Sequence, residues 1–320
     1  MTTTPRKTFP PIPKVTVCVI TYNQDKYIGA CLQSLVEQQT NFNFEIIVGD
    51  DCSTDGTRAI ILDFVRRYPH LIRTNFQPHN TGGSRNNLEV HAAAQGVYVA
   101  HIDGDDYALP GRLQAQADAL DADPGCNAVW HLVDFFDDVG GFCSGGTACL
   151  SMFPMGKVSF DNAIRLGYVG VFSSLMYRRS ALTPIKTDRN ILDLYFTWDT
   201  LSKGHGMILN EVLGRYRVAS TGSLQAASSK RVQDLAIEHA YEFHDRFAEH
   251  SSNFMIWALT RALILIVTGR RGASDYLRFA WRTRAWVGIS QVFSNLRNMR
   301  RARVKWREKR QLRQKGGIEC

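Results

Sequence analysis

Residues Val97–Asp106 read VYVAHIDGDD, a short apolar run that ends in a cluster of acidic residues. Runs rich in β-branched and aromatic residues are typical of a strand that is buried on both faces of a parallel sheet. Three carboxylates follow within four positions, and Gly104 lets the backbone turn tightly between the first two. Carboxylates this close repel one another, so the pattern favours either a solvated turn or a site for a divalent cation.

Mg²⁺ and Mn²⁺ suit such a cluster because they bind one or two protein carboxylates and complete their shell with phosphate and water. A nucleoside diphosphate would supply that phosphate. The spacing of the acidic residues does not match a calcium-binding EF-hand. The chain also lacks a G-x-x-x-x-G-K-[ST] loop and has no G-x-G-x-x-G after its first apolar run, which disfavours P-loop and dinucleotide sites.

Strands and helices are predicted to alternate on both sides of this stretch. The predicted strands are Val15–Ile20, Phe44–Val48, Leu71–Asn75, Val97–Ile102 and Ala128–Val133. The predicted helices are Tyr27–Gln38, Thr57–Tyr68, Arg85–Gln95 and Pro110–Asp121. This alternation predicts an α/β fold with a doubly wound, mostly parallel, Rossmann-like sheet.

Ligands bind doubly wound sheets at the carboxyl ends of the strands, which draws attention to three loops. These loops are Thr21–Asp25, Asp50–Asp55 and Asp103–Asp106. Asp50 and Asp51 end the second predicted strand. A carboxylate there either accepts hydrogen bonds from a base or a ribose, or caps the helix that follows.

The rest of the chain has weaker patterns. Gly and Ser residues predict a flexible loop at Gly140–Gly156, and apolar runs predict extended segments at Phe172–Tyr177 and Met207–Arg217. Asp193–Lys203 has helical spacing, and the sequence is helical in character from Lys230 onward.

Four stretches, in this order, resemble motifs of the family-two glycosyltransferases, which have the GT-A nucleotide-sugar-binding fold. They are Val15–Asn23 (VTVCVITYN), Phe44–Thr57 (FEIIVGDDCSTDGT), Asn80–Asp106 with its N-x-G, R-N, G-x-Y and D-x-D-D elements, and Tyr216–Ser223 (YRVASTGS). The likeness is to enzymes of bacterial cell-surface polysaccharide synthesis. It divides the chain into an N-terminal leader (1–13), a GT-A catalytic domain (14–224) and a basic helical C-terminal extension (225–320).

The resemblance implies roles for individual residues. Those expected to bind the nucleotide sugar are Thr21, Tyr22, Asn23, Asp51, Arg85, Asn86 and Asp103. Among them, Asp51 would bond the base, as the corresponding residue bonds uracil in the family. Asp103 and Asp105 would form the D-x-D pair that binds Mn²⁺ or Mg²⁺, with Asp105 as the direct ligand and Asp103 as support.

The general base in the family is an Asp that opens a helix about eleven residues before a Gly. Counting back from Gly204 indicates Asp193 in the segment LDLYFTWDTLSKG. Asp199 is the alternative, and because it lies six positions later it would face another side of the same helix.

The function implied is that of an inverting, metal-dependent glycosyltransferase. It would move a sugar from a nucleotide-diphosphate sugar, such as a UDP-sugar, to a hydroxyl of a glycan or a lipid-linked glycan in polysaccharide or lipopolysaccharide synthesis. A nucleotidyltransferase is an alternative, although the loop at Thr21–Asp25 lacks the Gly-rich basic sequence of that class. A non-catalytic nucleotide-sugar-binding module is another, and the intact Asp103, Asp105 and Asp193 argue against it.

Basic residues concentrate in the last 51 positions, which carry fifteen Lys and Arg against three acidic residues in a chain of net charge +8. Within them, Ala273–Trp286 (ASDYLRFAWRTRAW) mixes aromatic residues with arginines. Such a segment lies on an anionic membrane surface, packs on the catalytic body, or joins two copies of the chain as a homo-oligomer. No nucleic-acid-binding signature accompanies the charge, so nucleic acid is not an expected partner.

The N-terminal residues lack the apolar core of a signal peptide, and the seven Cys have no C-x-x-C spacing. These features predict a cytoplasmic protein with reduced thiols. If the basic extension binds lipid, the protein would lie peripherally on the inner face of the cytoplasmic membrane.

Overall fold

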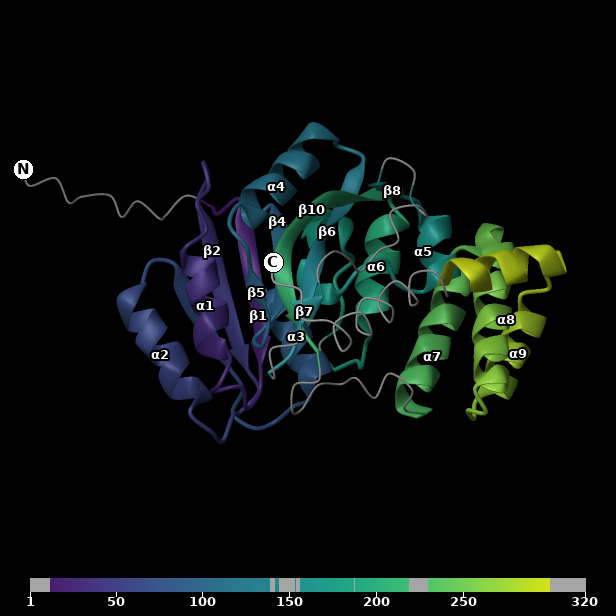
Figure 1. Ribbon diagram of the computed structural model, residues 1–320, viewed down its shortest axis with the longest axis horizontal. Helices are drawn as coiled ribbons and strands as arrows, with labels where there is room; N and C mark the ends of the chain where they lie inside the picture. Colours follow the sequence, from purple (N-terminus) through teal and green to yellow (C-terminus); the bar gives the residue numbers. More distant parts are fainter. Residues whose placement is uncertain are drawn as a thin grey trace, which may run out of the picture.

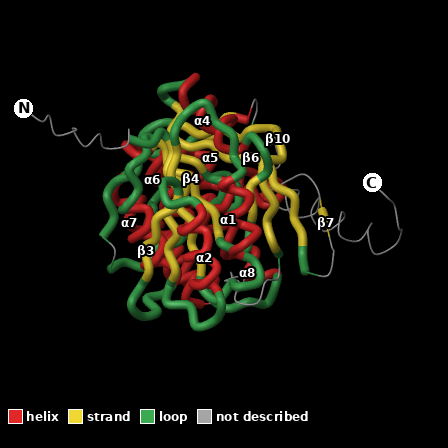
Figure 2. The backbone as a smooth tube through the Cα atoms, turned by 90° about the vertical axis from the view of Figure 1, so that its left-hand side faces the viewer, coloured by secondary structure: helices red, strands yellow, loops and turns green. Residues whose placement is uncertain are grey.

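A mixed β-sheet with helices on both faces forms the centre of the molecule (Figures 1 and 2). The structure is a computed structural model and describes residues 12–138, 142–143, 153, 156–186, 188–218 and 230–299. The order of the strands along the main path of the sheet is β3-β2-β1-β4-β9-β6-β10-β5.

The first half of the sheet is parallel, as the sequence predicts. Its strands are β1 (Val15–Thr21), β2 (Phe44–Asp50), β3 (Ile72–Phe76) and β4 (Tyr98–Asp103). The helices that connect them are α1 (Ile28–Val36), α2 (Thr57–Arg67) and α3 (Gly83–Ala92). β1 is almost wholly buried because it lies between β2 and β4 and between two layers of helices, which explains its unbroken apolar sequence.

The second half of the sheet is mixed. Its strands are β5 (Tyr107–Ala108), β6 (Cys126–Phe136), β7 (Phe142–Cys143), β8 (Lys157–Val158), β9 (Met176–Arg178) and β10 (His205–Arg217). β9 runs antiparallel to both β4 and β6, while β6 and β10 are parallel. The helical segments here are α4 (Arg112–Ala122), α5 (Phe160–Leu166), the 3₁₀ turns η3 (Phe172–Ser174) and η4 (Arg179–Ala181), and α6 (Asp193–Leu201).

Each face of the sheet carries its own hydrophobic cluster. Val17 and Val19 of β1 point to the face that α1, α2 and α4 cover, where Leu32 and Leu113 are fully buried. Cys18, between them, points to the opposite cluster, which α3, α5, α6 and the C-terminal helices supply. Successive residues of a strand face opposite sides, so a central strand is apolar at most of its positions.

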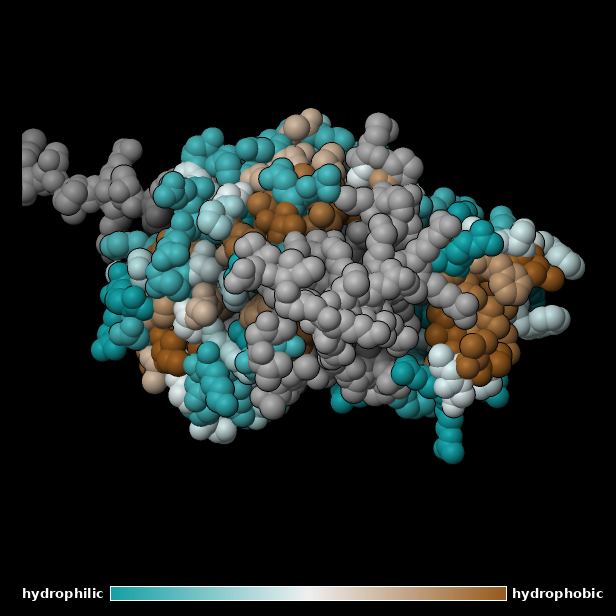
Figure 3. Space-filling view, in the orientation of Figure 1, coloured by the Kyte–Doolittle hydropathy of each residue, from teal (hydrophilic) through white to brown (hydrophobic). Residues whose placement is uncertain are grey.

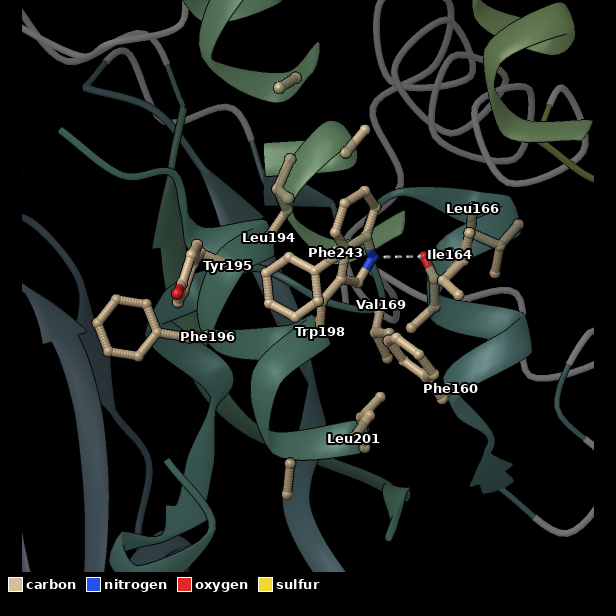
Figure 4. Packing of buried hydrophobic residues seen from close by; sticks show 14 of the residues in the cluster. Phe160, Ile164, Leu166, Val169, Leu194, Tyr195, Phe196, Trp198, Leu201 and Phe243 are labelled. Atoms are coloured by element: carbon tan, nitrogen blue, oxygen red, sulfur yellow. Dashed lines mark hydrogen bonds between the residues drawn. The ribbon is translucent and has the colours of Figure 1, made fainter. Parts of the chain in front are cut away.

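The C-terminal helices belong to this second cluster. They are α7 (Lys230–Arg246), the 3₁₀ turn η5 (Ala248–His250), α8 (Ser251–Val267), α9 (Ala273–Arg282) and a further helix at 289–299. Trp198 of α6 meets the rings of Phe243, Phe254 and Trp257 edge-on, with centroids 5.5 to 5.8 Å apart. Its indole N–H donates to the carbonyl of Ala163 at 3.1 Å (Figure 4). The α7–α9 helices therefore complete a core that α6 begins.

One helical segment among the described residues, Ala248–Val267, is long and apolar enough to cross a membrane by length and composition. In this structure 44% of it is buried, with Phe254, Trp257 and Ala262 inside the hydrophobic cluster. A core helix of a folded domain has the same composition, so the segment is weak evidence for a membrane span.

Two segments differ from the sequence prediction. Phe172–Tyr177 is not one strand, because a 3₁₀ turn occupies its first half and only Met176–Arg178 pair in the sheet. The hydroxyls of Ser173 and Ser174 bond nearby backbone groups, which competes with strand pairing. Helix α5 was not predicted, although a capping box formed by Ser159 and Asn162 marks its start.

The predicted loop at Gly140–Gly156 lies mostly outside the described residues. The proposed boundary between the catalytic domain and the C-terminal extension, at 224 and 225, also lies outside them.

Candidate functional site

The candidate site lies at the carboxyl edge of the parallel strands. β1 lies between β2 and β4, with Thr21 opposite Asp50 and Ile20 opposite Asp103. The three loops that leave these strands therefore emerge side by side. This edge is where a doubly wound sheet binds its ligand.

Asn23 joins the first loop to the second. Its side-chain Oδ1 accepts a hydrogen bond from the Thr54 N–H at 2.8 Å, and its own N–H donates to Ser53 Oγ at 2.9 Å. Thr21 is buried, and its carbonyl accepts the N–H of Asp51 at 3.1 Å. The Tyr22 ring, by contrast, is 45% exposed and is accessible to a planar ligand.

The two carboxylates that end β2 have different surroundings. Asp50 is fully buried and bonds Ser53 and the guanidinium of Arg58, so it shapes the loop and the start of α2. Asp51 accepts bonds from the N–H and hydroxyl of Thr81 at 2.7 and 2.9 Å and from the N–H of Gly82 at 2.8 Å. Asp51 thus connects the second loop to the start of α3.

Arg85 and Asn86, in the first turn of α3, point in different directions. Arg85 is half-exposed and pairs with Glu89 at 2.8 Å. Asn86 is fully buried, and its amide donates to the carbonyl of Gly49 at 3.0 Å. A side chain at Gly49 would collide with Val90 and Asn86, so α3 packs directly on the backbone of β2. Asn86 therefore lies beneath the site rather than at its surface.

The acidic loop packs closely against the first loop. The N–H of Gly104 donates to the carbonyl of Ile20 at 2.8 Å. A Cβ atom at Gly104 would approach Gln24 Oε1 to 2.6 Å and Thr21 Oγ1 to 2.9 Å, so only glycine fits there. Asp103 lies at the solvent boundary, where its Oδ1 bonds His101 Nε2 at 3.2 Å and its Oδ2 accepts from Ser173 Oγ at 3.3 Å.

Two arginines balance the charge of this loop. Arg217 of β10 donates through Nε to the carbonyl of Asp105 at 3.1 Å and through its backbone N–H to Asp106 Oδ1 at 2.7 Å. Arg112 is fully buried, and its guanidinium donates to the carbonyl of His101 at 2.8 Å. Burial, together with the charges of Asp105 and Asp103, raises the pKa of Asp106 well above its usual range.

Asp193 is the first residue of α6, and hydrogen bonds hold the segment before it. The hydroxyl of Ser84 in α3 donates to the carbonyl of Ile191 at 3.1 Å and accepts its N–H at 2.7 Å. The N–H of Leu192 donates to His239 Nε2 of α7 at 3.2 Å. Asp193 is therefore positioned jointly by the catalytic fold and by the C-terminal helices.

Asp193 is exposed to solvent, although protein atoms surround its carboxylate densely enough to desolvate it. Desolvation raises its pKa, and the negative charge of Asp103 raises it further. The electrostatic interaction with Asp103 means that Asp193 lies near the acidic loop although 90 positions separate them in sequence. A carboxylate with a raised pKa is a better proton acceptor than an ordinary surface Asp at neutral pH.

Asp199, on the same helix, has no exposed surface and several cationic and polar partners. It accepts bonds from Thr183 N–H at 2.6 Å, Lys203 Nζ at 3.1 Å and Arg246 at 3.0 Å. Burial alone would raise the pKa of Asp199, but these hydrogen bonds outweigh it and lower the pKa. Asp199 therefore holds α6 against the chain before it and against α7.

Tyr216 also belongs to the candidate site. The sequence motifs include it only as the first residue of the stretch Tyr216–Ser223 and predict no role for its side chain. Burial raises its pKa, and so do the charges of four nearby carboxylates, which belong to Asp103, Asp106, Asp105 and Asp193. Its phenol therefore stays protonated beside the acidic loop and can donate a hydrogen bond there. Ser173, which bonds Asp103, was missed because it follows 70 positions later and no local pattern marks it.

The residues of the acidic loop fit a hard divalent cation. Asp103 and Asp105 offer carboxylate oxygens, and the buried Asp106 Oδ2 has no hydrogen-bond partner among the described residues. No group of three His, Cys, Asp or Glu side chains is gathered as a complete metal site within the described part of the chain. Mg²⁺ and Mn²⁺ need only one or two protein carboxylates when phosphate supplies other ligands, so the donor set fits a cation that binds with a nucleotide.

Comparison with known proteins identifies the family. Residues 16–182 match the sequence profile of glycosyl transferase family 2. An uncharacterized protein of Mycobacterium tuberculosis is 30% identical over 222 residues, which are 68% of this chain and 62% of that protein. The chain thus spans somewhat less than two thirds of that relative's length.

Solved structures share the fold. That of S. aureus TarS 1-349 in complex with UDP-GlcNAc has a TM-score of 0.66 at 20% identity and covers 92% of both chains. The mannosyltransferase PcManGT from Pyrobaculum calidifontis, in complex with GDP-Man and Mn²⁺, has a TM-score of 0.56 at 17% identity, over 96% of this chain and 90% of that one. The fold is of the GT-A type with added C-terminal helices, and the chain belongs to glycosyl transferase family 2.

Proposed function

We propose that this protein is an inverting glycosyltransferase that moves a sugar from a nucleotide-diphosphate sugar to a hydroxyl of a glycan or lipid-linked glycan. One observation carries the proposal. Asp193, with a raised pKa, lies near the Asp103–Asp106 loop at the carboxyl edge of a nucleotide-binding type of sheet. A proton acceptor is thereby close to a cluster suited to a diphosphate.

The donor would bind across the first three loops. Tyr22 would lie against the base, and Asp103 would contact the sugar nucleotide. Asp51 already accepts three hydrogen bonds from Thr81 and Gly82, so it would bond the base through the acceptor site that remains on its carboxylate. Thr21, Asn23 and Asn86 would keep these loops in place, since their side chains or backbones join neighbouring segments. A UDP-sugar is the favoured donor, in line with the complex of TarS, and Arg85 would add a positive charge beside the phosphates.

Asp105 and Asp103 would hold a Mn²⁺ or Mg²⁺ ion. When bound with the nucleotide, such an ion supplies Lewis-acid stabilisation of the charge that develops on the diphosphate leaving group. The Mn²⁺ in the complex of PcManGT supports the choice of metal. Tyr216, protonated beside the same carboxylates, would donate a hydrogen bond toward the reacting groups.

Asp193 would act as general base. It takes the proton of the acceptor hydroxyl as the hydroxyl oxygen forms its bond to the anomeric carbon, while the bond from that carbon to the diphosphate breaks. This single displacement inverts the anomeric centre. General base catalysis is worth about 10²- to 10⁴-fold in rate. Asp199 is unsuited to the task in this structure because three neighbours already occupy its oxygens.

The test is donor transfer by the full chain, screened over nucleotide sugars with Mn²⁺ or Mg²⁺. Thermal shift finds the donor, because a ligand that binds only the folded state raises its stability. Asp193→Asn should keep donor binding and lose about 10²- to 10⁴-fold in transfer. Full transfer by Asp193→Asn, together with loss in Asp199→Asn, would reassign the base.

We further propose that the protein binds the cytoplasmic face of an anionic membrane, where a lipid-linked acceptor would lie. Hydrophobic residues gather over α8, α9 and the helix at 289–299 (Figure 3). Five large side chains there are 44 to 95% exposed, namely Leu277, Trp281, Trp286, Ile289 and Phe293.

The position of these side chains suits a lipid surface. Leu277 and Trp281 are four residues apart on α9, and Ile289 and Phe293 are four apart on the next helix, so each pair shares one helix face. Arg278 and Arg282 lie beside the first pair and remain largely exposed. Each Arg or Lys near an anionic bilayer contributes about 1 kcal/mol of attraction.

Co-sedimentation with phosphatidylglycerol-containing vesicles, against phosphatidylcholine alone, tests this surface. Trp281→Ser with Trp286→Ser should strongly reduce binding to the anionic vesicles. Leu62→Ser with Val97→Ser, which removes two exposed apolar side chains of the catalytic body, should not. Unchanged binding by the tryptophan variant would refute the proposal. A wild-type dimer that the tryptophan variant dissociates would instead assign this surface to a second copy.

A further inference from the structure

A chain of buried hydrogen bonds ends on the carboxylate of Asp103. The Tyr177 hydroxyl lies 2.9 Å from His91 Nδ1, His91 Nε2 lies 3.0 Å from His101 Nδ1, and His101 Nε2 lies 3.2 Å from Asp103 Oδ1. Its members come from β9, α3 and β4, which the fold brings together beneath the acidic loop. Tyr177, His91 and His101 are all buried.

With neutral imidazole rings, the order of the partners assigns the protons. The carboxylate of Asp103 can only accept, so His101 Nε2 carries a hydrogen and its Nδ1 accepts. His91 then donates from Nε2 and accepts at Nδ1 from the phenol of Tyr177. Burial and the neighbouring His101 lower the pKa of His91 well below its usual range, which agrees with a neutral imidazole. All donors therefore point toward Asp103.

Packing holds the two imidazoles in these orientations. Phe172 stacks on His101 with ring centroids 3.8 Å apart, and Phe196 lies against His91 at 4.9 Å. The backbone of His101 is held as well, since its N–H donates to the Leu175 carbonyl at 3.0 Å and its carbonyl accepts from Arg112. Neither ring can turn without losing a hydrogen bond in a buried place, where an unpaired polar group is costly.

We propose that His101, supported by His91 and Tyr177, is a positioning residue for Asp103. His101 occupies Oδ1 of the carboxylate, and the Ser173 hydroxyl contacts Oδ2 from the other side, so the group presents one orientation to whatever binds at the loop. Hydrogen-bond donors behind a metal-binding carboxylate orient it and favour its ionised form. The inference rests on the proposed function, because it assumes that Asp103 helps to bind a cation and a diphosphate.

The test measures Mn²⁺ binding in the presence of UDP by the electron paramagnetic resonance signal of free Mn²⁺, without any turnover. His101→Leu should weaken Mn²⁺ binding by about 10- to 100-fold, the usual effect of losing such a partner. His101→Gln should restore most of the affinity, because its amide can donate to the carboxylate. Tyr177→Phe, which removes only the far end of the chain, should have a smaller effect than His101→Leu.

The matched control is His131→Leu. His131 is also fully buried, but its Nδ1 bonds the carbonyl of Leu132 and it has no place in the chain to Asp103. It should lose stability without losing Mn²⁺ affinity. Circular dichroism melting of each variant shows that the protein is folded at the temperature of the binding measurement.

The outcomes separate the two proposals. If folded His101→Leu binds Mn²⁺ as tightly as the wild type while Asp105→Ala does not, the metal site stands and the positioning role is refuted. If Asp105→Ala and Asp103→Ala also bind like the wild type, the proposed metal site itself fails. Equal weakening by His101→Leu and His101→Gln would also count against the positioning role, because the restored donor would then have no effect.

Discussion

Two carboxylates on one helix differ because of what surrounds them. Asp193 is the exposed first residue of α6 and is affected by the charge of Asp103, while Asp199 lies six positions further along and binds Lys203 and Arg246. Desolvation dominates at the first and hydrogen bonds dominate at the second, so the pKa of Asp193 rises and that of Asp199 falls. These surroundings support the proposed role of Asp193 as general base and a structural role for Asp199.

Opposite shifts predict opposite effects on stability as the pH changes. The folded state favours protonated Asp193, so its charge costs stability once the pH exceeds the unfolded pKa near 3.8. Asp193→Asn should therefore melt at the same or a higher temperature than the wild type at pH 7, with the difference vanishing in acid. A lower melting temperature for Asp193→Asn at pH 7 would contradict this reading.

Asp199→Asn should show the reverse. The folded state favours its charged form, so its contribution is fully present above pH 3.8 and is lost as the pH falls through its lower folded pKa. The variant should melt below the wild type at pH 7, and the gap should close on acidification. Calorimetric melting of both variants from about pH 3 to about pH 8, a range that includes the ordinary carboxyl pKa values near 4, compares them directly.

Asp105 is predicted to matter for donor turnover and not for folding. Its backbone carbonyl holds Arg217, an interaction that Asp105→Ala preserves. At temperatures at which circular dichroism shows the variant to be folded, it should lose turnover of the nucleotide sugar, since the loop would lack its principal cation ligand. Near-normal donor hydrolysis by a folded Asp105→Ala protein would rule out the metal site.

At the scale of elements, the start of α6 depends on helices that precede and follow it in the chain. Ser84 of α3 makes two hydrogen bonds to the backbone of Ile191, and His239 of α7 accepts the N–H of Leu192. α6 has no side-chain cap of its own. The precision of Asp193 therefore comes from tertiary contacts rather than from the helix.

Ser84→Ala should loosen this arrangement. Loss of two hydrogen bonds costs about 1–3 kcal/mol in stability, and Asp193 would lose part of its orientation. We expect kcat for transfer to fall more than the KM for the donor rises. Ser251→Ala, whose hydroxyl contacts His244 and the Ala248 carbonyl far from the site, should lose similar stability with kcat unchanged. Equal kinetics for the two variants would refute the role of Ser84.

At the scale of the whole molecule, the catalytic body and the C-terminal helices share one hydrophobic cluster. Trp198 of α6 lies inside an aromatic group that includes Phe243 of α7 (Figure 4) and Phe254 and Trp257 of α8. Trp198 is thus enclosed by these helices together with α5, whose Ala163 carbonyl accepts its indole N–H. The C-terminal helices therefore stabilise the helix that carries Asp193, in addition to forming the proposed membrane surface.

Two tryptophans of the C-terminal helices should differ sharply in their effect on stability. Trp257→Ala empties a site that is 1% exposed and should cost about 3–5 kcal/mol, while Trp281 is 85% exposed and Trp281→Ala should change stability by less than about 0.5 kcal/mol. Urea unfolding midpoints of the two variants test this. A large loss in Trp281→Ala would show that its surface is covered in solution, which would also count against the membrane surface.

The alternation of buried strands and helices was predictable because central strands are mostly apolar on both faces, as β1 and β4 are apart from residues such as Thr16 and His101. The position of Asp103–Asp106 at a strand end followed from the same pattern. Segments in which side chains compete with strand pairing for backbone hydrogen bonds were not predictable. In η3, for example, the hydroxyls of Ser173 and Ser174 bond backbone groups and the segment does not pair in the sheet. Helix α5 was not predicted, although its capping box of Ser159 and Asn162 is present in the sequence.

The sequence by itself determined the α/β architecture and the strand ends at which the acidic loops emerge. The reason is that the periodicity of hydrophobic residues and the positions of turn-forming residues depend only on neighbouring positions in the chain. It could not distinguish Asp193 from Asp199 by their surroundings, reveal that Asn86 is buried, or connect Tyr177 and His91 to Asp103. Only the tertiary structure decided these points. Burial, hydrogen bonding and charge interaction depend on distances in space between residues that are up to 90 positions apart, and no local pattern records those distances.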